Sequence, residues 1–86
     1  MNPTAEALNY LAESASRNIH VISLAGTVPE GEALDFLRTQ VATLATVAGI
    51  VNADSVTQVW ERYGVQVHML DAEELMSAAL ELGRLI

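Results

Sequence analysis

The sequence predicts a mainly helical α+β fold for residues 1–86, a single small domain with a small two-stranded sheet. Three observations lead to this fold class. A long apolar stripe follows Glu32, runs of strand length stand at 19–24 and 65–70, and helix-capping residues separate these segments. The predicted order is helix, strand, helix, helix, strand, helix. An all-α helical bundle is the alternative, because periodicity alone does not decide the conformation of short apolar runs.

The first predicted helix runs from Thr4 to about Arg17, because Pro3 and Thr4 open a helical pattern in which apolar residues recur on one face. The β-branched run Ile19-His20-Val21-Ile22-Ser23-Leu24 then predicts a buried strand. Continuation of the first helix to Ala25 stays open, because apolar residues also keep helical spacing across this boundary. These residues are Leu11, Ala15, Ile19 and Ile22.

A long central helix is predicted from Glu32, where apolar residues recur in alternating steps of three and four. The stripe consists of Leu34, Leu37, Val41, Leu44, Ala48 and Val51. The segment Asn52-Ala53-Asp54-Ser55 then interrupts the pattern and supplies N-cap chemistry for a further helix, which Gly64 closes.

The run Val65-Gln66-Val67-His68-Met69-Leu70 alternates in polarity and predicts the second strand, with a helical conformation as the open alternative. Asp71, with Glu74 three residues later, predicts a variant of the capping box at the start of the last helix. The apolar face of that helix consists of Leu75, Ala78, Ala79, Leu82 and Leu85.

Charge and composition exclude several classes of partner. Eleven carboxylates stand against four arginines and no lysine, for a net charge of −7, which disfavours binding to nucleic acid or to an anionic membrane surface. The longest uncharged stretch, from Thr39 to Ala53, contains polar residues and is shorter than the roughly 20 apolar residues of a membrane span. The chain has no cysteine and its first residues do not resemble a secretory signal, so we expect a cytoplasmic protein.

An enzyme is not expected, because the sequence has no phosphate-binding loop, no dinucleotide-binding motif and no serine nucleophile motif. His20 and His68 would meet if the two predicted strands paired, but two histidines without further ligands do not make a metal site. We therefore predict no catalytic residues, no cofactor and no metal.

Three groups of residues are candidates for binding. Trp60, Arg62 and Tyr63 form the predicted partner-binding cluster, since aromatic residues and arginine dominate protein interfaces. With 51% apolar residues in so short a chain, a homodimer is also expected. It would form through the predicted strands or through small residues that permit close helix approach, namely Ala42, Ala45 and Gly49. The predicted acidic surface consists of Glu30, Glu32, Asp35, Asp71, Glu73 and Glu74.

The segment from Leu44 to Val59 resembles the helix-turn-helix of small repressors, with an alanine, Gly49 as the turn glycine and a polar second helix. It departs from that pattern by one extra residue before Val56. The favoured function is a small acidic regulatory or inhibitory protein that binds another protein, typical of phages and mobile elements. The alternatives are an acidic nucleic-acid mimic that occupies a basic site, a degenerate helix-turn-helix regulator and a structural subunit.

Overall fold

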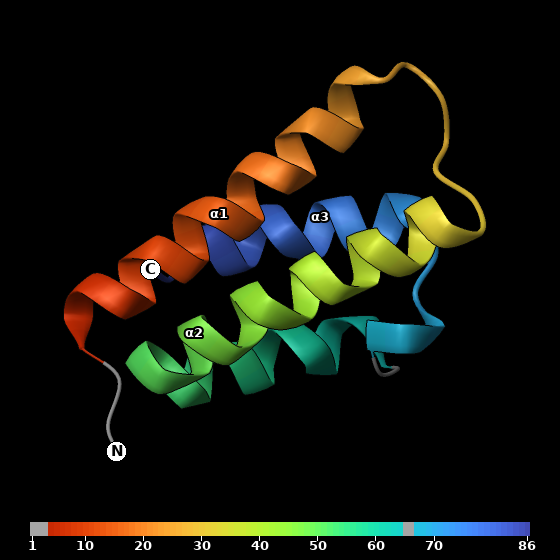
Figure 1. Ribbon diagram of the computed structural model, residues 1–86. Helices are drawn as coiled ribbons and strands as arrows, with labels where there is room; N and C mark the ends of the chain where they lie inside the picture. Colours follow the sequence, from red (N-terminus) through yellow and green to blue (C-terminus); the bar gives the residue numbers. More distant parts are fainter. Residues whose placement is uncertain (1–3, 65–66) are drawn as a thin grey trace.

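The computed structural model describes residues 4–64 and 67–86, which form three α-helices and one 3-10 turn. In Figure 1, α1 (Ala5–Leu24) and the first part of α2 (Glu32–Tyr63) run antiparallel in front, and α3 (Ala72–Gly83) lies behind them. The turn η1 (Val67–Met69) leads into α3. No strand forms within 4–64 and 67–86, so the predicted α+β class with its two-stranded sheet is wrong and the all-α alternative describes the fold.

Helix α1 continues through the first predicted strand and ends at Leu24. Thr4 caps the helix, since its hydroxyl oxygen accepts a hydrogen bond of 3.1 Å from the Ala7 backbone N–H. Ile19 is buried on the same face as Ala12 and Ala15. This packing at helical spacing outweighs the modest preference of β-branched residues for a strand. A strand at 19–24 would also have no neighbouring strand to pair with among the described residues.

The second predicted strand is also absent from the described part of its range. Residues 67–69 form the turn η1, and positions 65 and 66 lie outside the described residues. Leu70 is fully buried, and its carbonyl oxygen accepts a hydrogen bond of 3.2 Å from the Arg38 guanidinium on α2. The segment therefore serves as a tight connection that inserts Leu70 into the core.

Helix α2 consists of two helical parts that meet at Asn52, whose backbone is not helical (φ −154°, ψ 79°). The Asn52 side-chain oxygen accepts a hydrogen bond of 3.3 Å from the Ser55 backbone N–H, which caps the second part. Figure 1 shows that the chain reverses here and that the second part returns below the first. Gly64, with a left-handed backbone (φ 69°), ends the second part as predicted.

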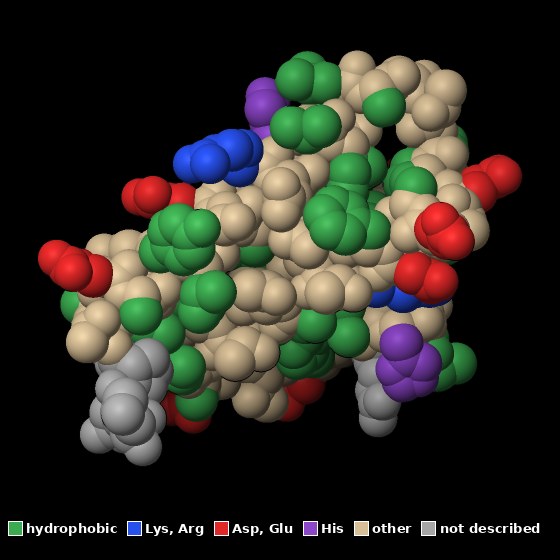
Figure 2. Space-filling model, in the orientation of Figure 1, with side chains coloured by type: hydrophobic (Ala, Val, Ile, Leu, Met, Phe, Trp, Pro, Cys, Tyr) green, Lys and Arg blue, Asp and Glu red, His purple; other side chains and the backbone are tan. Residues whose placement is uncertain are grey.

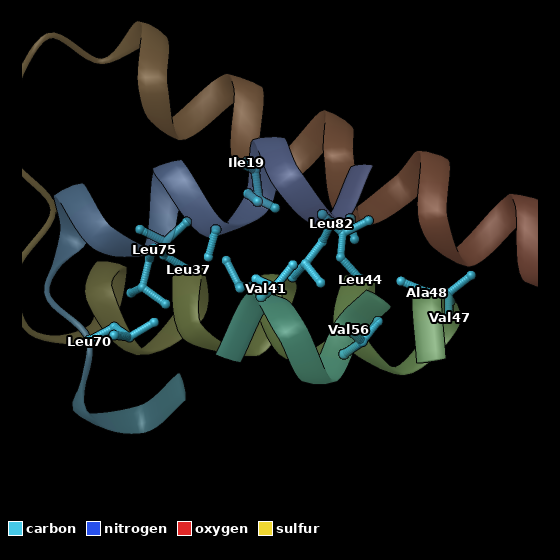
Figure 3. Packing of buried hydrophobic residues seen from close by; sticks show 14 of the residues in the cluster. Ile19, Leu37, Val41, Leu44, Val47, Ala48, Val56, Leu70, Leu75 and Leu82 are labelled. Atoms are coloured by element: carbon cyan, nitrogen blue, oxygen red, sulfur yellow. The ribbon is translucent and has the colours of Figure 1, made fainter. Parts of the chain in front are cut away.

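The core lies between α1, both parts of α2 and α3, and every buried residue among those described is apolar. Leu37, Val41 and Leu44 project from α2 towards Leu75 and Leu82 of α3 (Figure 3). The start of α3 is set by the predicted capping box, because Asp71 accepts from the Glu74 backbone N–H at 2.8 Å and the Glu74 carboxylate accepts from the Asp71 N–H at 3.1 Å.

By length and composition alone, one stretch within Glu32–Met69 could cross a membrane, with a mean hydropathy of 1.3. A core helix of a water-soluble protein, which is mostly buried, passes the same test, and 28% of the apolar 18-residue window in this stretch is buried inside the fold. The stretch is therefore weak evidence for a membrane span.

Candidate functional site

The predicted partner-binding cluster, Trp60, Arg62 and Tyr63, lies on the second part of α2 and is joined to α3 by Glu81. The Glu81 carboxylate forms an ion pair with the Arg62 guanidinium and accepts a hydrogen bond of 3.1 Å from the Tyr63 hydroxyl. The rings of Trp60 and Tyr63 are tilted by 58°, with centroids 6.4 Å apart. Glu81 thus pairs with a residue 19 positions earlier in the sequence.

This arrangement changes the chemistry of Tyr63. Partial burial, followed by the hydrogen bond and the negative charge of Glu81, raises the pKa of the Tyr63 phenol above its ordinary value of 10.0. Trp60 is half-buried and packs against the core. The polar groups of the cluster therefore tie two helices of the same chain together, which leaves less of their bonding capacity for a partner.

The six residues of the predicted acidic surface gather at one end of the molecule. Figure 1 places the N-terminal ends of α2 and α3 side by side at this end, and the bond from Arg38 to the Leu70 carbonyl agrees with their proximity. Asp35 pairs with Arg38 at 3.4 Å, and Glu74 is engaged in the capping box. Part of the negative charge is thus compensated within the chain, and the helix N-termini offset a further part.

The small residues Ala42, Ala45 and Gly49 are half-buried on one side of α2, and Ala45 packs against the core. A side chain added at Gly49 would meet no atom within 4 Å. Among the described residues, no other helix therefore approaches Gly49 closely. A different side of α2 is the more exposed one, and it carries Phe36, Thr39, Thr46 and Ile50.

The two histidines do not meet. His20 is exposed on α1 and His68 is exposed in η1, and Figure 2 shows the two imidazoles at separate edges of the molecule. Within 4–64 and 67–86, no group of three or more His, Asp or Glu side chains could hold a metal ion.

The segment that resembles a helix-turn-helix has a different geometry from that motif. Gly49 lies inside the first part of α2, and the break falls at Asn52. The two parts then run back along each other, as seen in Figure 1, and Val56 and Val59 of the second part are buried. A helix-turn-helix instead crosses its helices at roughly 90–120°.

A groove between α1 and α3 was not predicted from the sequence. Three hollows lie in a row along these helices. The hollow beside the α1–α2 loop shares Ser23 and Met76 with the central hollow, and the central hollow shares Ser16 and Gly83 with the hollow at the other end. The central hollow has a volume of about 580 Å³. Its lining includes Ser16, Ile19, His20, Leu44, Met76 and Leu80.

The groove is lined mainly by apolar atoms, with Arg84 and His20 beside its central hollow, and its two ends differ in charge. Leu80 lines it and is 67% exposed, although it lies outside the apolar stripe expected for the last helix. Asp71 and Glu73 line the end near the α1–α2 loop, and Arg17 lines the other end beside Glu13. Figure 1 shows why the groove exists, since α1 diverges from α3 towards Leu24. The sequence contained one indication of this groove, because Leu80 is an apolar residue outside the apolar stripe of its helix.

No protein-family model, curated protein or solved structure matches this chain. Function is therefore inferred from the geometry and charge of the chain itself.

Proposed function

We propose that this chain is a small regulatory protein that binds another protein by taking an amphipathic helix of that partner into the groove between α1 and α3. The continuous apolar groove is the observation that carries this proposal. Its three hollows follow the whole of α3, a helix of 12 residues, and thus offer the length of about three helical turns. Apolar grooves of this kind receive amphipathic helices through anchors spaced three or four residues apart.

The side chains in the groove support an apolar occupant. Leu80 leaves a large part of its apolar surface in water, and covering that surface stabilises a complex by about 25 cal/mol per Å². Met76 is half-buried beside it, and methionine side chains adapt readily to the shape of a partner. Ile19, Leu44 and Ala79 complete the apolar lining.

The negative charge of the chain limits which partner segments can bind in the groove. The chain carries a net charge of −7, and the groove ends beside Asp71 and Glu73, close to the other acidic residues at the start of α2. Complementary charges at the rim of an interface raise the association rate and set the orientation of the partner. The favoured partner segment is therefore an amphipathic helix with lysine or arginine residues at one end.

The test is affinity capture from the native host with three proteins: the wild-type chain, Leu80→Glu and Gln58→Glu. Leu80→Glu places a carboxylate in the groove, whereas Gln58→Glu makes the same change of charge on the exposed surface of α2. We expect one protein to be captured by the wild type and by Gln58→Glu and to be lost with Leu80→Glu. Far-UV circular dichroism of all three proteins checks that each remains helical.

Capture that Leu80→Glu leaves unchanged would refute the groove as the binding site. If the captured protein then binds nucleic acid and is released by salt, the acidic nucleic-acid mimic becomes the better explanation, because exposed charge contacts are screened. Failure of the wild type to retain any protein would contradict the proposed function as a whole.

A further inference from the structure

A face free of charged side chains runs across α1 and the first part of α2, on the side of α1 away from the groove. Figure 2 shows this face in the middle of the view, with charged side chains around its edges. We call it the neutral face. It consists of Leu11, Ser14, Asn18 and Val21 from α1 and of Phe36, Gln40, Thr43 and Ile50 from α2.

Four large apolar residues of the neutral face are well exposed. Leu11 is 45% exposed, Val21 61%, Phe36 47% and Ile50 56%. Between the two helices, the Asn18 side-chain amide donates a hydrogen bond of 3.1 Å to the Gln40 side-chain oxygen Oε1. A pattern of exposed apolar residues around a polar pair is typical of helix interfaces in which the polar pair sets the alignment.

The threonine on the neutral face presents little polarity to solvent. The Thr43 hydroxyl donates a hydrogen bond of 3.0 Å to the Thr39 carbonyl oxygen of its own helix. Its donor is thus satisfied within α2, and a partner can cover this side chain without leaving an unpaired hydroxyl proton.

The surface area of the chain indicates how much of it a partner would cover. The chain exposes 5664 Å², whereas a compact monomer of 9.2 kDa exposes about 4,900 Å². The excess of about 760 Å² is close to the roughly 800 Å² that each partner buries in a stable interface. The excess, to which the open groove between α1 and α3 also contributes, is thus no larger than one interface of ordinary size.

We propose that a second copy of this chain covers the neutral face and forms a symmetric homodimer. Two chains that each carry a charge of −7 repel each other, and here they can meet without opposing their carboxylates. A two-fold axis near Asn18 and Gln40 sets the apolar residues of each copy against those of the other, and α1 and α2 of both copies then form a four-helix layer. The dimer leaves the groove between α1 and α3 open.

Sedimentation equilibrium of the full chain tests the dimer. We expect the wild type to have twice its chain mass of 9.2 kDa. Phe36→Glu should weaken the dimer by at least about tenfold, because symmetry places two new carboxylates in one interface. Ile50→Glu is the second variant, and both remain helical by circular dichroism since the two side chains are already about half exposed.

Two control variants separate this interface from other surfaces. Leu80→Glu makes the same change in the groove and should remain dimeric. Gly49→Ala should also remain dimeric. A weaker dimer in that variant would indicate that the interface lies at Ala42, Ala45 and Gly49 and would overturn the proposal. Salt should tighten the wild-type dimer between about 0.05 M and 0.5 M NaCl, because it screens the repulsion between the two acidic subunits.

A wild-type chain that stays monomeric, or a Phe36→Glu variant that dimerises as well as the wild type, would contradict the proposal. Binding of the chain to neutral phosphatidylcholine vesicles, lost in Phe36→Glu, would assign the neutral face to a membrane instead. The proposed function fails or succeeds separately, because it depends on capture through Leu80 and not on the oligomeric state.

Discussion

Replacing Asn52 by alanine tests the reversal of the chain inside α2. The Asn52 side chain caps the second part of α2 through the Ser55 backbone N–H, at 3.3 Å, and Asn52 itself is not helical. Loss of an N-cap costs about 1 kcal/mol of stability. Since Asn52 and Ser55 are not fully buried, water replaces part of the lost bond, and the cost should not exceed this figure.

The measurement is the free energy of unfolding in urea, followed by circular dichroism and by the fluorescence of Trp60, which lies in the second part of α2. In thermal unfolding, about 1 kcal/mol corresponds to a decrease in Tm of roughly 4–8 °C for a domain of this size. Asn52→Asp is the matched control, because aspartate retains an acceptor oxygen and should stay within a few tenths of a kcal/mol of the wild type. Equal stability of Asn52→Ala and the wild type, or an equal loss in both variants, would refute the capping role.

Four further outcomes are expected. Leu44→Ala should lower the free energy of unfolding by about 3–5 kcal/mol, since Leu44 is fully buried in the core. A double-mutant cycle of Arg62→Ala and Glu81→Ala should give a coupling of only about 0.5–1 kcal/mol, because the Arg62 side chain is 55% exposed and solvent screens the pair. Gly49→Ala should stabilise the chain by about 0.5–1 kcal/mol in urea, because Gly49 is helical and nothing lies within 4 Å of the added methyl group. Above about pH 10, stability should fall more steeply in the wild type than in Tyr63→Phe, because the pKa of Tyr63 is raised in the folded chain and the unfolded chain loses that proton first; equal slopes in a pH series of urea titrations would contradict this.

The capping residues were predictable from the sequence. Thr4, Asn52 and Asp71 each accept a hydrogen bond from a backbone N–H three residues later, and Gly64 ends its helix with a left-handed backbone. All these interactions are local, so the identity and spacing of nearby residues are sufficient to identify them.

The two predicted strands show where local reasoning failed. The β-branched residues at 19–24 favour a strand in isolation, but Ile19 is buried in the core by continuing the helical spacing of Ala12 and Ala15. A strand also requires a neighbouring strand for its backbone hydrogen bonds, and 67–69 form a 3-10 turn instead. The conformation of each run therefore depended on the other and on the packing of α2 and α3.

The candidate sites were likewise predictable from the sequence only in part. Trp60, Arg62 and Tyr63 were recognisable as a cluster by residue type, but their link to Glu81 joins positions far apart in the chain. The groove and the neutral face arise from the angle and alignment at which α1 packs on α3 and α2, which no residue pattern within one helix contains. The sequence by itself determined the charge of the chain, the helix starts at Asn52 and Asp71 and the helix end at Gly64, because charge depends on composition and caps depend on neighbours. It did not determine the end of α1, which was expected near Arg17 and lies at Leu24. Only the tertiary structure decided whether 19–24 was helix or strand and which surfaces stayed open, because both depend on contacts between residues distant in the sequence.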